Sequence, residues 1–83
     1  MQYRNDLDWL RKFDEFSDEE QKILLALSHE KYKWRSRDRL LRLTRMNVKR
    51  LERTLAHLLV DDLIRPALTD KGNIVFGLKE RVG

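Results

Sequence analysis

Residues 36–64 read SRDRLLRLTRMNVKRLERTLAHLLVDDLI, and they contain two amphipathic segments joined by a short polar turn. Ser36 is a suitable N-cap for the first segment, because its hydroxyl can accept a hydrogen bond from a free backbone N–H of the first helical turn. Asp38 lies in that turn, where a carboxylate favours the positive end of the helix dipole. The apolar spacing then predicts a helix whose inner face is formed by Leu40, Leu41 and Thr44.

The second segment is the most amphipathic part of the chain, and Asn47 is a suitable N-cap for it. Its apolar side chains fall within about 100° of arc when each residue advances by about 100° around the helix axis. They are Val48, Leu51, Leu55, Leu58 and Leu59. The pattern predicts a long helix over residues 47–60 with one buried face.

A third helix is predicted upstream, over residues 18–29. Ser17 and Glu20 have the spacing of a capping box, in which the hydroxyl and the carboxylate each accept a hydrogen bond from a backbone N–H. Ile23, Leu24 and Leu27 then recur at helical spacing and predict a core-facing side.

Strand signals surround the long helix on both sides. Residues 63–68 and 74–78 are apolar and flank a turn-rich stretch that contains Gly72, so they predict a β-hairpin. Pro66 cannot donate to a strand ladder, which places its nitrogen on an unpaired side or at a bulge. Tyr32 and Trp34 alternate with Lys33 and predict a short strand or a pair of bulky side chains covering the core. The alternative is that the two rings stack on nucleic-acid bases.

The first 16 residues form a separate unit in this prediction. A short amphipathic helix is expected near residues 6–14, with Asn5 as its cap. It would serve as an accessory or dimerisation element, while residues 17–83 form the main domain. Its candidate aromatic anchors for a partner or a second copy are Trp9, Phe13 and Phe16.

Length and composition indicate one small globular domain. The 83 residues are 41% hydrophobic and 39% charged, which is enough apolar material for a core and too little Gly and Pro for a disordered chain. The absence of Cys excludes a disulfide framework and a thiolate metal site. The sequence has no apolar run of about 18 residues and does not begin like a secretion signal, so we expect a cytoplasmic protein with no membrane partner.

Positive charge is concentrated in the middle of the chain. The net charge is +4, but residues 35–57 alone hold eight Arg and Lys against two acidic residues, whereas residues 1–20 hold three against seven. A local cationic excess of this kind is typical of a nucleic-acid-binding surface. The alternative interpretation is a solvated helix face that serves only solubility.

The order and spacing of these elements resemble the winged helix-turn-helix superfamily. The resemblance is carried by Ser36, the Leu40-Leu41 pair, Thr44, the turn at residues 45–47, the apolar positions of the next helix, and the exit at residues 62–64. It implies an α+β fold with a three-helix core and a C-terminal β-hairpin wing, to which this chain adds an N-terminal helix. Arg45 and Asp62 stand where the family often has Gly. Asp tolerates left-handed backbone better than most non-glycine residues, so Asp62 is a mild departure, whereas Arg45 is a departure that bears on the geometry of the turn.

The resemblance implies double-stranded DNA binding, with the helix at residues 47–60 in the major groove and the wing on the neighbouring backbone. Arg50 and Arg53 could each form two hydrogen bonds to guanine or clamp a phosphate. We expect the cationic groups from Arg39 to Arg53 to share one ridge, with Arg65 as a further wing candidate. The predicted DNA-binding residues are Arg39, Arg42, Arg45, Asn47, Lys49, Arg50, Arg53, His57 and Lys71. Such a protein would be a transcription regulator or a DNA-linked accessory domain.

The rival interpretation is a winged-helix module that binds another protein within a larger assembly. Catalysis has no candidate in the sequence, because His29 and His57 stand in no recognisable catalytic or metal-ligand spacing. We therefore expect no enzyme activity, no cofactor and no small-molecule ligand. A homodimer through the N-terminal helix is compatible with both interpretations.

Overall fold

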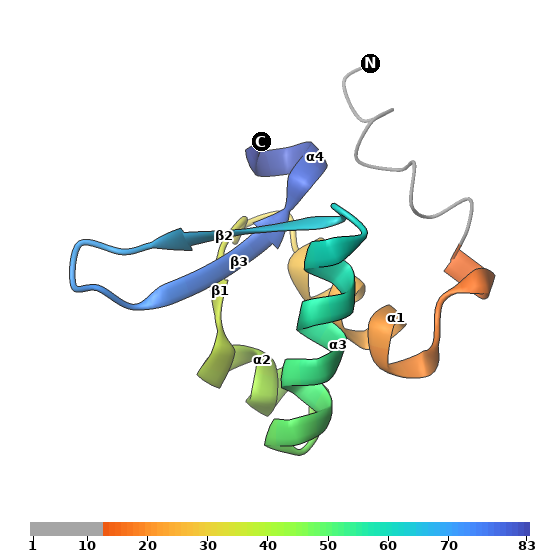
Figure 1. The fold of residues 1–83 in the computed structure, drawn as a ribbon. Coiled ribbons are helices and arrows are strands. Elements are labelled where there is room, and N and C mark those ends of the chain that lie inside the picture. Colours follow the sequence, from red (N-terminus) through yellow and green to blue (C-terminus); the bar gives the residue numbers. More distant parts are fainter. Residues whose placement is uncertain (1–12) are drawn as a thin grey trace.

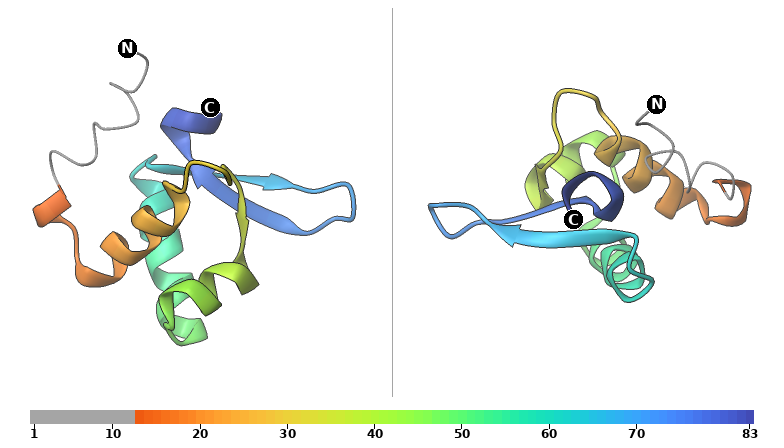
Figure 2. Two further views of the ribbon diagram at one scale, coloured as in Figure 1. Left: turned by 180° about the vertical axis from the view of Figure 1, so that it is seen from behind. Right: turned by 90° about the horizontal axis from the view of Figure 1, so that it is seen from above.

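The computed structural model describes residues 13–83, which form four helices and a three-stranded antiparallel sheet (Figure 1). In chain order these are α1 (Asp18–Leu27), β1 (Arg35–Ser36), α2 (Arg37–Thr44), α3 (Val48–Val60), β2 (Ile64–Leu68), β3 (Ile74–Leu78) and α4 (Lys79–Val82). Figure 2 shows from two further sides that the β2–β3 hairpin projects well beyond the helices. The expected small α+β domain is confirmed at this level.

Each main helix begins at the predicted cap. The Ser17 hydroxyl accepts from the backbone N–H of Glu20, whose carboxylate accepts from the Ser17 N–H in return, so the capping box is complete. Ser36 Oγ accepts from the backbone N–H of the third residue of α2 at 3.1 Å. Asn47 Oδ1 does the same at the start of α3, at 2.8 Å. Short-range hydrogen bonds therefore define where each helix starts.

Two non-glycine residues adopt left-handed backbone where the winged-helix pattern often has Gly. Arg45 has a φ of 58° at the end of α2, and Asp62 has a φ of 62° after α3. Thr44 stabilises the turn at Arg45: its hydroxyl donates to the Leu40 carbonyl at 2.7 Å and accepts from the Met46 N–H at 3.4 Å. The tight connection between α2 and α3 thus forms without glycine.

The sheet has the order β1-β3-β2, with both pairs antiparallel. The hairpin register is continuous from Ile64↔Leu78 to Leu68↔Ile74, and Gly72 in the turn has a φ of 84°. Pro66 lies on the edge strand β2 in this unbroken register, so its nitrogen faces the unpaired side, as expected.

The core lies where α1, α2 and α3 meet one side of β3. Buried side chains from every one of these elements fill it, and α1 packs against both other helices. They are Ile23, Leu24, Leu27, Leu40, Leu51, Leu55, Leu58, Ile64, Phe76 and Leu78. The predicted helical stripes are the sides that are buried, although Val48 remains exposed.

The C-terminal helix α4 was not predicted from the sequence, and one arginine connects it to α1. The Arg81 guanidinium donates to the backbone carbonyls of Leu27, His29 and Glu30, at 3.1, 2.7 and 3.3 Å. These oxygens end α1 and begin the following loop, so Arg81 supplies donors that the helix itself lacks there.

One prediction about aromatic residues is wrong. Strand β1 covers residues 35–36, so Tyr32 and Trp34 precede it in a loop and are 51% and 39% exposed rather than filling the core. Phe13 and Phe16 are partly buried and pack against the core, while Trp9 lies outside the described residues. The expected helix at residues 6–14 falls almost entirely outside the described residues, and residues 13–15 form one turn of 3₁₀-helix.

Candidate nucleic-acid interface

The outward stripe of α3 is cationic in its first half. Since Leu51 and Leu58 are fully buried, the opposite side of the helix carries Lys49 and Arg53, about one turn apart. Within residues 13–83 neither side chain forms an ion pair. Farther along the same stripe Val60 is 82% exposed, so the cationic part is confined to the N-terminal half.

Asn47 and His57 occupy the two ends of this surface. The side-chain oxygen Oδ1 of Asn47 already caps α3 by accepting a backbone hydrogen bond. Its side-chain NH₂ remains as the group that can donate to a phosphate. His57 is exposed on the last turns of α3. The helix N-terminus adds a partial positive charge at the end where Asn47 lies.

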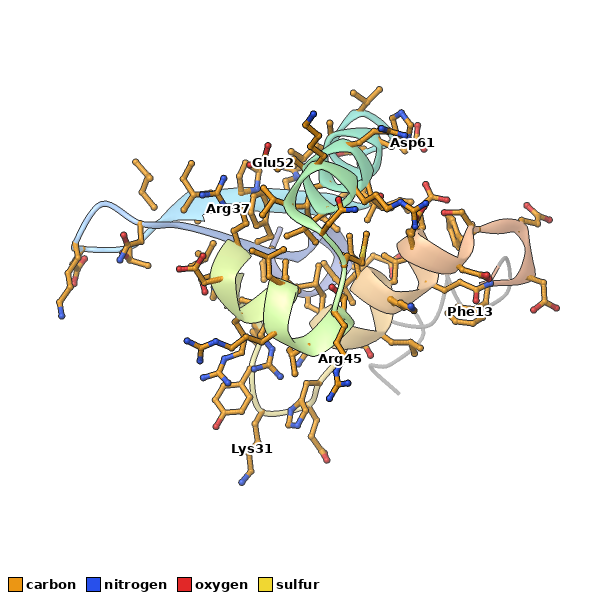
Figure 3. All side chains as sticks on the ribbon, turned by 90° about the horizontal axis from the view of Figure 1, so that it is seen from below. Phe13, Lys31, Arg37, Arg45, Glu52 and Asp61 are labelled. Carbon is orange, nitrogen blue, oxygen red and sulfur yellow. The ribbon has the colours of Figure 1, made fainter. Side chains whose placement is uncertain are left out.

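Two arginines of the basic segment are neutralised by acids on other elements. Arg50 points toward α1, where its Nη1 lies 3.2 Å from Glu19 Oε2. Arg37 at the start of α2 pairs with Glu52 of α3 at 2.5 Å. Figure 3 shows this second pair at the junction of the two helices, on the side where the hairpin departs. Neither pairing could be read from charge patterning along the chain.

Arg39 and Arg45 lie apart from the cationic stripe of α3. Arg39, Arg42 and Arg45 are exposed, and Arg39 lines a cavity beside the loop after α1. Figure 3 shows Arg45 on the side of α2 that faces away from Glu52 and α3. The single ridge expected from Arg39 to Arg53 is therefore divided, because the outward faces of two crossing helices point in different directions.

A groove of about 550 Å³ separates α3 from the hairpin and the start of α2. Its walls combine apolar side chains with the Arg37–Glu52 pair. The residues on its α3 side are Glu52, Leu55, Ala56 and Leu59, and those on its hairpin side are Gly72, Asn73, Ile74 and Phe76. Lys71 is exposed at the tip of the hairpin, next to this groove in sequence.

The hairpin's second candidate cation is held by an acid. Arg65 Nε lies 3.6 Å from Asp62 Oδ1, and the Lys79 ammonium donates to the other Asp62 oxygen. The hydrogen bond from Lys79, followed by the charges of Lys79 and Arg65, lowers the pKa of Asp62 against the opposing effect of desolvation. This cluster connects the end of α3 to β2 and α4 and leaves Lys71 as the better-placed hairpin contact.

Sequence reasoning considered base stacking by Tyr32 and Trp34 but favoured core packing for them, and it did not associate Arg35 with the two rings. The Arg35 guanidinium carbon lies 4.6 Å from the centre of the Tyr32 ring, and all three residues line the cavity beside Arg39. The only available signal was the run of aromatic and basic residues at positions 31–35, which was interpreted as a strand.

Other kinds of site find no support in residues 13–83. This part of the chain contains no cluster of three or more His, Asp or Glu side chains that could hold a metal ion. None of its helices has the length and apolar character needed to span a bilayer. No protein-family model matches this chain, and it matches no curated protein and no solved structure.

Proposed function

We propose that the domain is a winged helix-turn-helix that binds double-stranded DNA, with α3 in the major groove and the β2–β3 hairpin along the backbone. The element order, the glycine-free turn between α2 and α3, and the projecting hairpin support the proposal. In this arrangement α2 lies across the groove and positions α3.

One observation carries the proposal: Lys49 and Arg53 form an exposed cationic stripe on the N-terminal half of α3, without an acidic partner in the described residues. The N-terminal residues of a recognition helix are those that reach base edges. Arg53 can form two hydrogen bonds to guanine O6 and N7, and Lys49 can bind a phosphate as a point charge. Asn47 and Lys71 would contact the flanking backbone.

The remaining candidates take lesser roles in this proposal. Arg50 must first leave Glu19 before it can reach a phosphate. The three arginines of α2 and its C-terminal end would contact DNA only if the DNA backbone bends around that helix; they are Arg39, Arg42 and Arg45. His57 lies farther from the N-terminus of α3 than the cationic stripe does.

The test is a fluorescence anisotropy titration of a labelled mixed-sequence duplex at about 50 mM salt, repeated at increasing salt. For a protein that neutralises phosphates, the logarithm of the binding constant falls linearly with the logarithm of the salt concentration, with a slope of about 0.9 per phosphate contact. The double variant Lys49→Gln, Arg53→Gln is expected to weaken binding through loss of the Arg53 base contact, and to reduce this slope by about 0.9 through loss of the Lys49 phosphate contact. The matched control Lys22→Gln removes an exposed charge from α1 and should change neither strongly. Absence of duplex binding at about 50 mM salt contradicts the proposal.

A protein-binding role is the second candidate, and the groove between α3 and the hairpin favours it. Leu55, Leu59 and Ile74 give its walls an apolar character that phosphate contact does not require. Phe13 and Phe16, two of the aromatic residues predicted to contact a partner, are partly buried against the core. Retention of duplex binding by the double variant would favour this second role for α3.

A further inference from the structure

A cavity of about 310 Å³ opens between the loop after α1 and the start of α2. It is lined by Tyr32, Trp34, Arg35, Ser36 and Arg39. The volume lies at the lower end of the range found for small-ligand sites. Its lining residues include two aromatic and two arginine residues and no acidic residue, so the site suits a ligand that is both aromatic and anionic.

The aromatic rings are partly exposed and directly precede a strand that is paired with β3. Residues 35 and 36 pair with β3, and a Cβ added at Gly77 would lie 3.1 Å from Trp34 Cε3. One edge of the indole is therefore fixed against the sheet while 39% of the residue remains open to solvent. Tyr32 is 51% exposed, and its ring centre lies 5.3 Å from that of His29.

The two arginines at this cavity are oriented in different ways. Arg35 stacks its guanidinium over the Tyr32 ring and donates from Nε to the Ala26 carbonyl at 3.4 Å, which fixes its direction. Arg39 is exposed, and its side chain has no ion pair among residues 13–83. A fixed planar cation on an aromatic ring, next to a free guanidinium, suits stacking on a base and binding of its phosphate.

We propose that this cavity binds a nucleotide, with the base stacked against Trp34 and Tyr32 and the phosphate held by Arg39 and Arg35. The ligand is a free mononucleotide or an unpaired nucleotide of a strand, since the two share the same recognition chemistry. The site is separate from the duplex surface proposed for α3, and neither Lys49 nor Arg53 lines it.

The full-length chain contains two tryptophans, so the variant Trp9→Phe makes Trp34 the only indole reporter. Tryptophan emission is measured while deoxythymidine monophosphate, a ten-residue oligothymidylate or a blunt duplex is added. We expect saturable quenching by the mononucleotide, the oligomer or both, because a stacked base quenches the indole. Saturation by the mononucleotide as tight as by the oligomer identifies a free nucleotide as ligand, and a strong preference for the oligomer identifies a strand.

Matched variants in the same background separate the site from general charge attraction. Arg39→Gln is expected to weaken binding about tenfold through loss of a charged hydrogen bond, whereas Lys31→Gln removes a neighbouring exposed charge that does not line the cavity. Tyr32→Ala should weaken binding at least about fivefold, and Tyr32→Phe should preserve it. Thermal unfolding of each variant identifies any that is misfolded.

The proposal is overturned by absence of saturable quenching with both the mononucleotide and the oligomer. Equal losses for Arg39→Gln and Lys31→Gln overturn it as well, because they would indicate nonspecific attraction. Failure of the nucleotide proposal can be distinguished from failure of the duplex proposal. Lys49→Gln, Arg53→Gln should leave the quenching unchanged, and a chain that binds the nucleotide but no duplex contradicts only the function assigned to α3.

Discussion

The contact between α1 and Arg50 makes a sharp prediction about affinity for DNA. Glu19 holds the Arg50 guanidinium at 3.2 Å, with the two side chains 35% and 63% exposed. If α3 binds a duplex, this acid competes with phosphate for Arg50. Glu19→Gln keeps the size of the side chain and removes the competitor, so we expect it to increase affinity for duplex DNA.

The geometry limits the size of the effect. Two unit charges 3.2 Å apart attract by about 1.3 kcal/mol in bulk water, and measured exposed pairs contribute only about 0.2–1 kcal/mol. Releasing Arg50 should therefore tighten duplex binding by about two- to fivefold at low salt. The slope of log affinity against log salt should become steeper by about 0.9, because one more phosphate is neutralised. The free energy of unfolding should fall by no more than about 1 kcal/mol.

Asp18→Asn is the matched control, since it removes an equal charge from the same first turn of α1 without an ion pair to Arg50. Both variants lose a favourable interaction with the helix dipole, so their stabilities should change alike apart from the pair itself. Anisotropy titrations of one duplex with the wild type and both variants, at three salt concentrations, supply the comparison. Equal affinity gains for the two variants, or none for Glu19→Gln, would refute the reasoning that Arg50 is held away from phosphate.

Two further predictions concern the framework that holds the hairpin. A Cβ added at Gly77 would lie 2.8 Å from the Lys33 carbonyl oxygen and 2.9 Å from a Val82 methyl group, so Gly77→Ala should lower the free energy of unfolding by about 1–3 kcal/mol. A urea titration measures this loss, and an unchanged urea midpoint contradicts the close approach. The pKa of Asp62 is lowered in the folded state, so its carboxylate stabilises the fold above about pH 4, and this stabilisation is lost as the pH falls through the folded pKa. Asp62→Asn should therefore have a lower melting temperature than the wild type at about pH 7, and a difference that is as large at about pH 2 contradicts the ion-pair origin.

Much of the fold was predictable because it depends on neighbours in sequence. Caps such as Ser17 and Ser36 act over three residues, and helical apolar stripes bury the same side in almost any compact arrangement. Prediction was weaker for residues 28–34, where no periodic pattern exists. The short strand β1 depends on pairing with β3, about 40 residues away, and a propensity argument placed it one to three residues too early.

The candidate sites were predictable in composition and not in arrangement. Exposure of Lys49 and Arg53 followed from their position opposite the buried leucines of α3. The pairing of Arg50 with Glu19, and of Arg37 with Glu52, depends on which helices meet and at what angle. The cavity beside Arg39 forms within residues 32–39, where the loop before β1 meets the start of α2, and no periodic pattern in this stretch indicated it.

The amino-acid sequence alone determined the helix starts, the buried stripes and the hairpin, because each results from interactions within a few residues or from burial of apolar surface. Only the tertiary structure decided which cations share a surface, which are neutralised, and where Tyr32 and Trp34 stand open to solvent. The physical reason is that electrostatic interaction and cavity formation depend on distances between elements, and those distances are set by packing of the whole core.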